Sequence, residues 1–328
     1  MIVRRQLPVL ALGSLLAIGL ILPLALKLSA PGFWLEVLLG GLMAGVLYSL
    51  VALGFVLIFK ASGVFNFAQG SMVLFAALCV ARMAEKMPLW LAILLAVAIM
   101  VALAFVVERL VLRPLVNQDG VALLMATLGV TYFLDGFGQT VWGSDIYEIN
   151  LGIQREPVMI LDNLIQGGIL INRDDVAAAI VAVVLVAALA LFFQKTKTGR
   201  ALRAVADDHQ AAQSIGIPLN RIWVIVWSIA GVVAIVGGVI WGGKLGVQFS
   251  ISQVALKALP VVILGGFTSI PGAIIGGLII GLGEKISEVY LGPLLGGGIE
   301  NWFAYMLALI FLLFRPEGLF GERHIDRV

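Results

Sequence analysis

The sequence contains very few of the residues on which most enzymes and extracellular domains rely. Of its 328 residues one is a cysteine, Cys79, and two are histidines, His209 and His324. A single cysteine excludes an internal disulfide framework and a CxxC metal site. Both histidines lie in charged segments, and the sequence contains neither an HExxH nor a GxSxG motif. No metal site and no nucleophile–base pair are expected, so we do not expect an enzyme.

Charged residues are scarce as well. They make up 12% of the chain, and hydrophobic residues make up 61%, whereas a soluble domain is about 25% charged and about 45–50% apolar. The formal net charge of +2, with no long basic run, argues against a nucleic-acid partner. So many apolar residues cannot all be buried in one water-soluble globule, because its surface must be polar. The composition therefore predicts a membrane protein surrounded by lipid.

The sequence also lacks a G-x4-GK[ST] phosphate-binding loop. The most similar segment, GLGEKIS at residues 281–287, has Glu284 directly before its lysine, where the motif requires its second glycine. No cofactor is expected in this chain, and any dependence on ATP must come from a partner subunit that binds the nucleotide.

Long apolar runs occupy most of the chain. Backbone amides in hydrocarbon must bond within their own segment, so these runs should be helices of about 20 residues. The sequence predicts an all-α, polytopic transmembrane bundle of about 8–10 spans. The candidate spans are residues 7–26, 35–59, 65–83, 89–111, 121–142, 176–193, 222–241, 254–265, 270–286 and 302–314. The eighth and tenth are short and are candidates for broken or re-entrant helices.

The distribution of lysine and arginine predicts the orientation. The run at 7–26 is too long for a signal peptide and is expected to stay as a first span. A cytoplasmic N-terminus places most of these cations on the cytoplasmic side, with Lys257 inside the eighth span. Both termini are then cytoplasmic. The single membrane domain is divided into a helical group 7–194, a cytoplasmic loop 195–221, a second helical group 222–314 and a tail 315–328.

The cytoplasmic loop, KTKTGRALRAVADDHQAAQSIG at 195–216, interrupts the apolar chain with a charged segment. Thr198 is expected to cap a helix over 199–206, and Asp207, with Gln210 as its capping-box partner, a second helix that ends near Gly216. One shared apolar face is predicted for Leu202, Val205, Ala212 and Ile215. The pattern alone leaves two interpretations open: helices lying on anionic lipid headgroups, or a helix that fits a groove of another protein.

Polar residues inside the predicted spans are candidates for a translocation pathway. The spacing of Asn66 and Gln69 places them on one helix face, and Thr127, Thr131 and Asp135 recur every fourth residue. Helix–helix hydrogen bonding is the alternative for both sets. Asp135 is the only carboxylate expected well inside a span, and without a second one an ion-coupled secondary transporter is disfavoured. A channel is harder to exclude from the residues.

Five segments of the chain resemble known transporter sequences. QAAQSIG at 210–216 is similar to the EAA-xxx-G loop of ABC-importer permeases, with Gln210 in place of the usual glutamate. Residues 41–72, 198–217, 264–281 (LGGFTSIPGAIIGGLIIG) and 315–321 (RPEGLFG) resemble the branched-chain amino acid permease family, and within it the smaller of two permease subunits.

This resemblance implies a function and a set of partners. The cytoplasmic loop would couple the permease to ATPase subunits, through Arg200, Arg203, Asp207, Gln210, Ala211, Ala212 and Gly216. The partners would be a second permease subunit, two ATPase subunits that bind the ATP, and a periplasmic receptor, in the bacterial inner membrane. The expected substrates are branched-chain or other apolar amino acids, and urea or short amides are the alternative within the family. The pathway is expected to hold no fixed charge opposite a zwitterion.

Overall fold

The computed structural model describes residues 30–321 except 64, 116–117, 154–155, 161–167 and 208. The first predicted span, 7–26, and the end of the tail, 322–328, lie outside the described residues. The side chains of Asp207, His209, Gln210 and Val254 lie outside them too.

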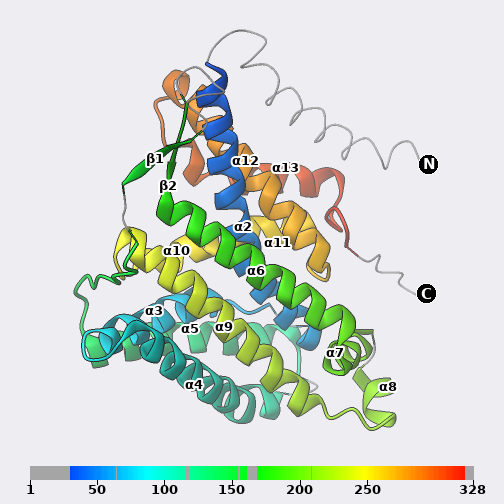
Figure 1. The fold of residues 1–328 in the computed structure, drawn as a ribbon. Helices are drawn as coiled ribbons and strands as arrows, with labels where there is room; N and C mark the ends of the chain where they lie inside the picture. Colours follow the sequence, from blue (N-terminus) through cyan, green and yellow to red (C-terminus); the bar gives the residue numbers. More distant parts are fainter. Residues whose placement is uncertain are drawn as a thin grey trace. The chain divides into compact units, whose positions relative to one another are not determined.

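The described chain is mainly helical, which confirms the predicted fold class (Figure 1). Within it, six helical segments are long and apolar enough to cross a membrane: α2 (Pro31–Ser62), α4 with its extension (Leu89–Leu115), α5 (Gly120–Trp142), α6 (Arg173–Lys195), α9 (Leu219–Leu245) and α12 (Ile270–Leu295). Shorter apolar helices are α3 (Gln69–Ala84), α10 (Ser250–Leu256), α11 (Ala258–Gly265) and α13 (Phe303–Phe314). Every candidate span from residue 35 onward therefore corresponds to a helix or a pair of helices.

The eighth candidate span is broken, as its length predicted. Helix α10 ends at Leu256 and α11 begins at Ala258, with Lys257 between them. Pro260 explains the break: it has no N–H to bond to the carbonyl of Leu256, and its ring would clash with that carbonyl in a continuous helix. In the first turn of α11 the missing N–H costs nothing, because N–H groups there have no helical partner.

The polar stretch between α5 and α6 contains a small sheet that the all-helical prediction missed. Strand β1 (Pro157–Ile160) pairs antiparallel with β2 (Ile169–Asn172), with Pro157 opposite Asn172. Both strands are short apolar runs, and such runs are too short for their periodicity to indicate a strand.

The chain divides into two compact units that are each discontinuous in sequence. Unit 1 contains the described residues of Met1–Ala52, Gly152–Val184 and Lys257–Val328, and unit 2 those of Leu53–Leu151 and Leu185–Leu256. Helices α2 and α6 contribute residues to both. The chain passes from unit 2 to unit 1 at the break between α10 and α11.

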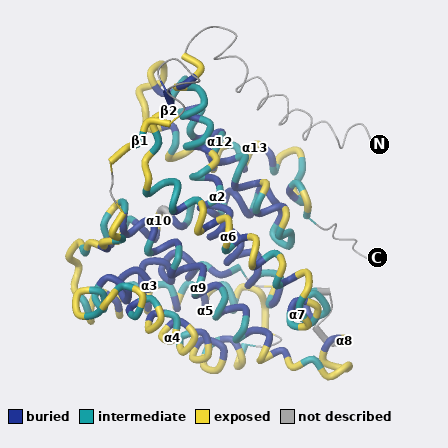
Figure 2. Tube along the Cα trace, viewed as in Figure 1, coloured by how far each residue is buried: buried dark blue, intermediate teal, exposed yellow. Residues whose placement is uncertain are grey.

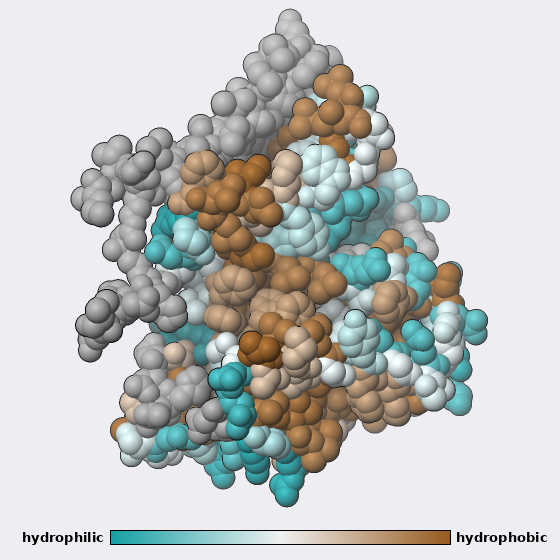
Figure 3. Space-filling model, turned by 180° about the vertical axis from the view of Figure 1, so that it is seen from behind, coloured by the Kyte–Doolittle hydropathy of each residue, from teal (hydrophilic) through white to brown (hydrophobic). Residues whose placement is uncertain are grey.

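In unit 2, α3 and α9 form the buried centre, and α3 packs against α4, α5, α9 and α10. Glycine allows the two central helices to approach closely, since a Cβ at Gly238 would lie 2.6 Å from the carbonyl oxygen of Val73. Helix α4 buries one narrow stripe, in which Ala92, Ala96, Met100 and Ala104 recur every fourth residue (Figure 2). Much of the rest of α4 is apolar and exposed, including Trp90 at 64%. Such surfaces suit lipid, and Figure 3 shows broad apolar areas on the molecule.

In unit 1, α2 and α12 form a seam of small residues. A Cβ at Gly45 would lie 2.7 Å from the carbonyl oxygen of Gly277, and one at Gly281 would lie 2.4 Å from the amide nitrogen of Gly45. The Ser49 hydroxyl also donates to the Ile274 carbonyl at 3.0 Å. The two backbones are in direct contact, so no larger residue fits at the seam.

Candidate functional site

The charged loop at 195–221 folds into two helices, as predicted: α7 (Lys197–Asp207) and α8 (His209–Ser214) (Figure 1). The predicted cap of the first helix is wrong by two residues. The hydroxyl of Thr196, not Thr198, accepts a hydrogen bond from the Gly199 amide, at 3.0 Å. Gly199 packs directly on the end of α6, where an added Cβ would lie 2.2 Å from the Phe193 carbonyl oxygen. No larger residue than glycine fits at this position.

Helix α7 is fixed to the rest of unit 2 by both faces. Leu202 and Val205 are fully buried, as their predicted face requires. Arg203 donates from its guanidinium to the carbonyl oxygen of Phe193, which is one of the free acceptors at the C-terminus of α6. Arg203 thus holds this joint together, whereas Arg200 is exposed and available to a partner.

Helix α8 ends in a defined cap rather than a frayed turn. Ile217 donates its amide to the Ala212 carbonyl at 3.0 Å, and Gly216 donates to Gln213 at 3.0 Å with φ of +86°. This pair of bonds is the Schellman arrangement, in which glycine supplies the left-handed residue. The predicted helix end near Gly216 is confirmed.

The predicted coupling residues in and after α8 differ in exposure to solvent. Ala212 is buried, and Ala211 and Gly216 are exposed. Ile215 was predicted on the buried face and is instead 73% exposed, because α8 ends at Ser214 and Ile215 no longer follows the helical period. Asp207 ends α7 and Gln210 lies in α8, and their side chains are outside the described residues. Their expected capping contacts stay predictions.

Asn66 and Gln69 are both fully buried in unit 2. Asn66 precedes α3 instead of lying on it, and its side-chain oxygen accepts from the Ala68 amide at 3.1 Å. Its amide group donates to the Gln69 side chain at 3.4 Å, and Gln69 donates to the Ala230 carbonyl on α9 at 3.4 Å. This is the geometry of helix–helix hydrogen bonding, the alternative that the spacing left open. A role in the pathway stays a prediction.

The polar stripe of α5 runs from a buried to a half-buried position. Thr127 is buried and its hydroxyl bonds the carbonyls of Leu124 and Phe65, at 3.0 and 3.2 Å. Thr131 donates to the Thr127 carbonyl at 2.9 Å. Asp135 is half-buried, and one of its carboxyl oxygens, Oδ1, has no hydrogen-bond partner. The hydroxyls of Thr127 and Thr131 are therefore hydrogen-bonded, whereas Asp135 keeps one carboxyl oxygen without a hydrogen-bond partner.

The expectation that Asp135 is the only carboxylate well inside a span is wrong. Glu108, at the end of the fourth span, is fully buried, and Glu284, within α12, is 3% exposed. The sequence carried a signal for Glu284, because it extends the small-residue face of α12 that includes Gly277 and Gly281. No comparable pattern marks Glu108.

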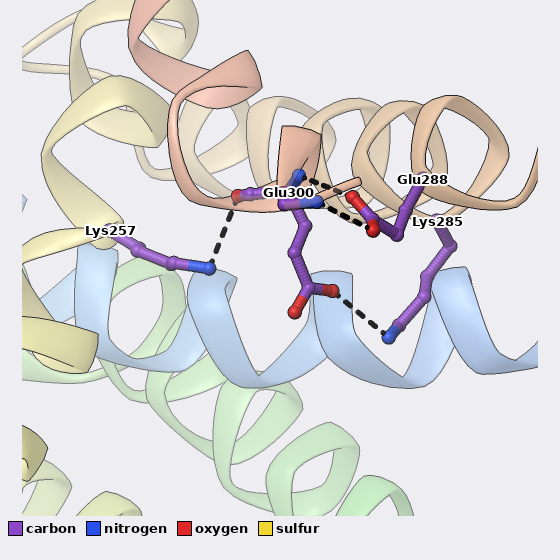
Figure 4. Close-up of polar contacts among 5 residues, drawn as sticks. Lys257, Lys285, Glu288 and Glu300 are labelled. Atoms are coloured by element: carbon purple, nitrogen blue, oxygen red, sulfur yellow. Dashed lines mark hydrogen bonds and ion pairs between the residues drawn. The ribbon is translucent and has the colours of Figure 1, made fainter. Parts of the chain in front are cut away.

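Unit 1 thus contains a cluster of charged side chains, defined here as Lys257, Glu284, Lys285, Glu288 and Glu300, four of which Figure 4 labels. Glu288 accepts from the amides of Gly298 and Glu300, at 2.9 and 3.0 Å. Lys285 lies 3.3 Å from the Glu300 carboxylate, and Lys257 donates to the Glu300 carbonyl at 3.2 Å. The expectation that the translocation pathway holds no fixed charge opposite a zwitterion stays a prediction.

Comparison with known proteins identifies relatives along nearly the whole chain. Residues 37–315 match the family model described as the permease component of the branched-chain amino acid transport system. The chain is 29% identical over 312 residues to the "High-affinity branched-chain amino acid transport system permease protein BraD" of Pseudomonas aeruginosa, covering 90% of this chain and 98% of that protein. It is 28% identical over 318 residues to the "High-affinity branched-chain amino acid transport system permease protein LivH" of Escherichia coli (strain K12), covering 90% of this chain and 98% of that protein. A probable branched-chain amino acid transport permease of Methanocaldococcus jannaschii is 29% identical over 299 residues, or 87% of this chain and 92% of that one.

Proposed function

The chain belongs to the permease family of the branched-chain amino acid transport system, and on this premise we propose that it forms the translocation path for apolar amino acids in an ATP-driven importer. The observation that carries the proposal is the match over residues 37–315, which overlaps each of the six helices of the described chain that are long and apolar enough to cross a membrane. The protein is a multi-pass membrane permease and not an enzyme.

The proposed substrates are branched-chain or other apolar amino acids. The bacterial relatives BraD and LivH are named for branched-chain amino acid transport and are matched over 98% of their length. This supports the same substrate class for the present chain. The location that we propose is the bacterial inner membrane, with the N-terminus, the C-terminus and the loop that contains α7 and α8 on the cytoplasmic side.

The proposed importer needs subunits that this chain does not supply. The sequence has no phosphate-binding loop, so two partner ATPase subunits would bind the ATP. A second permease subunit would complete the membrane domain, and a periplasmic receptor would deliver the substrate. The exposed apolar side chains of α4 would contact lipid.

We propose α7 and α8 as the element that docks on the ATPase. Movement in one subunit can shift another only through a stiff contact, because a loose loop would absorb the displacement. The buried residues Leu202, Val205 and Ala212 and the Arg203 bond to α6 supply that stiffness. Ala211 on α8 and Ile215 directly after it are exposed and are suited to fill a groove on the partner.

The test of the function is uptake by the complete importer in proteoliposomes. With the second permease, the ATPase subunits and the receptor present, labelled leucine should accumulate only when ATP is supplied. Accumulation driven by a proton or sodium gradient without ATP would contradict the proposal, and so would passive equilibration without ATP.

The docking proposal has its own test in the same complex. Ala211→Asp on α8 and Ile215→Asp directly after it each add a charge at an exposed position without entering the core. Each should reduce ATPase capture in pull-down and ATP-dependent uptake by about tenfold, which corresponds to roughly 1.4 kcal/mol. Ser144→Asp adds the same charge at an exposed position after α5, predicted on the opposite membrane face, and should leave both unchanged. Normal ATPase capture by both α8 variants would refute the docking role.

A further inference from the structure

The residues that follow α13 turn back toward the rest of unit 1, and the function proposed above has not used them (Figure 1). The carbonyl of Arg315 accepts a hydrogen bond from the Gly318 amide at 3.1 Å, which closes a turn directly after the helix. Pro316 stands second in this turn and Gly318 fourth, where β-turns favour these residues. Gly318 is buried and has φ of +79°, a left-handed backbone that glycine adopts freely. The sequence of this segment therefore suits a tight turn at the end of α13.

Residues 318–320, here called the tail cap, bond to the end of α11. The Leu319 amide donates to the Leu264 carbonyl at 2.8 Å, and the Phe320 amide donates to the Gly265 carbonyl at 3.1 Å. These are the last two carbonyls of α11, and the final carbonyls of a helix have no partner within it. Leu264 and Gly265 are both buried. The tail cap thus supplies the donors that these buried carbonyls need.

Glycine allows the tail cap and the end of α11 to approach closely. A Cβ at Gly318 would lie 2.7 Å from both the Cα and the amide nitrogen of Gly266, and 2.9 Å from the Ile263 carbonyl oxygen. A Cβ at Gly266 would lie 2.6 Å from the Gly321 amide nitrogen. All of these neighbours are backbone atoms, which cannot rotate away. The contact therefore depends on glycine on both sides.

The same end of α11 also contacts the start of α12. A Cβ at Gly265 would lie 2.3 Å from the Gly272 carbonyl oxygen. The Ser269 hydroxyl, which accepts from the Gly272 amide at 3.1 Å, caps α12 beside this contact. A helix of eight residues has little stability of its own, so such contacts, and not helix propensity, determine where α11 lies.

We propose that the tail cap fixes the C-terminal end of α11 and makes Gly318 a positioning residue for transport. The inference rests on the proposed transport function, whose topology has the C-terminus on the cytoplasmic side. Helix α11 begins at the break in the eighth candidate span, and broken helices in transporters bring backbone groups to the transported species. Movement from the cytoplasmic side reaches that break through α11 only if the far end of α11 is fixed, because a loose end absorbs the displacement.

The test is the number of leucine molecules taken up per ATP hydrolysed by the reconstituted importer. Gly318→Ala forces a Cβ into the backbone at the end of α11. It should lower this ratio about fivefold or more, because hydrolysis continues while α11 no longer follows it. ATPase capture and the leucine concentration at half-maximal uptake should stay unchanged. A loss of folded protein alone would instead lower uptake and hydrolysis together and leave their ratio as in the wild type.

Gly296→Ala is the matched control. Gly296 lies in unit 1 and also has positive φ, of +94°, but a Cβ there meets nothing within 4 Å. The variant carries a similar left-handed strain without the contact, so its ratio should stay within about twofold of wild type. Equal ratios for Gly318→Ala and Gly296→Ala would refute the positioning role, and so would parallel losses of uptake and hydrolysis in Gly318→Ala.

Hydrogen exchange of the complex in detergent tests the tail cap independently of transport. In the wild type the amides of Leu319 and Phe320 should exchange about a hundredfold more slowly than in an unstructured peptide. In Gly318→Ala the amides of α11 should exchange faster, while those of α3 and α9 in unit 2 keep their rates. The wild-type measurement decides the matter if Gly318→Ala does not accumulate, since unprotected amides at Leu319 and Phe320 would refute the tail cap. Protected amides without uptake by the wild-type complex would refute the proposed function instead.

Discussion

Two buried glutamates, one in each unit, show how differently an apolar helix can hold a carboxylate. Glu108 in unit 2 is fully buried, and each of its oxygens receives an N–H of Arg113, at 3.0 and 2.9 Å. Glu284 in unit 1 is also buried, yet its Oε1 has no hydrogen-bond partner. A bidentate arginine–carboxylate pair neutralises the carboxylate and gives each of its oxygens a hydrogen bond. Both oxygens of Glu108 are therefore paired, whereas one oxygen of Glu284 is buried without a hydrogen-bond partner.

The local backbone explains why only Glu108 obtains such a partner. It begins the π-helical turn η1 (Glu108–Leu112), which is followed by η2 (Arg113–Leu115). Pro114 cannot bond the carbonyl of Leu110, so the regular helix ends here and the backbone widens. The change of period brings Arg113 to Glu108, while the side chain of Arg113 stays 41% exposed. Glu284 lies in an uninterrupted part of α12, where no arginine lies within a turn.

The largest expected effect comes from forcing open the seam beside Glu284. In Gly281→Ala the new Cβ would lie 2.4 Å from the Gly45 amide nitrogen and 2.5 Å from the Gly41 carbonyl oxygen. Both obstacles are backbone atoms that cannot rotate away, so we expect a loss of about 3 kcal/mol. The thermal unfolding midpoint in detergent should fall sharply.

The control for this change is Gly40→Ala on α2. A Cβ at Gly40 meets nothing within 4 Å, so alanine should be neutral or slightly stabilising through its higher helix propensity. Equal midpoints for Gly281→Ala and Gly40→Ala would show that the helices of unit 1 are not held by this contact.

A smaller loss of stability should follow from breaking the Glu108–Arg113 pair in unit 2. Arg113→Met leaves Glu108 buried and unpaired, which costs about 2 kcal/mol after allowance for the partly exposed arginine. Adding Glu108→Gln should restore most of the unfolding midpoint, since no charge is then left buried. Arg109→Met removes an exposed cation four residues earlier and should change little. A double variant as unstable as Arg113→Met would mean that Arg113 stabilises by packing alone.

The sequence was sufficient to predict the helices, because lipid exposure forces long apolar runs into spans. The span at 89–111 corresponds to α4, and the short run at 254–265 was expected to be broken. The place of the break follows from Pro260. The sheet of β1 and β2 could not be found in the same way, since four-residue strands are shorter than the windows that reveal a period.

The sites were predicted less well than the helices, for reasons that differ from residue to residue. Glu284 could have been found, since it continues the face of Gly277 and Gly281. The pairing of Glu108 with Arg113 could not, because a spacing of five brings side chains together only where the helix widens. The exposure of Ile215 depends on where α8 ends, and helix ends are the least certain part of any pattern.

The smallest expected effect tests the neutral polar groups of unit 2 against the charged ones of unit 1. Thr127→Val keeps the side-chain shape and removes hydrogen bonds to the carbonyls of Phe65 and Leu124. Hydrogen bonds between membrane helices contribute about 0.6 kcal/mol on average, so the unfolding midpoint should fall slightly. Thr140→Val, which removes an exposed bond to the Gly136 carbonyl, is the control and should have no effect.

Uptake separates the two roles that Thr127 could have. If Thr127 only joins helices, the Thr127→Val importer should show a small drop in unfolding midpoint and a correspondingly small drop in leucine uptake. The reason is that the hydroxyl of Thr127 bonds the carbonyl of Phe65, in the connection before α3, and not a substrate. The satisfied geometry of Thr127 favours this result, in contrast to the unsatisfied Glu284. A large loss of uptake at an unchanged unfolding midpoint would place Thr127 in the translocation pathway and would contradict its role as a helix-joining residue.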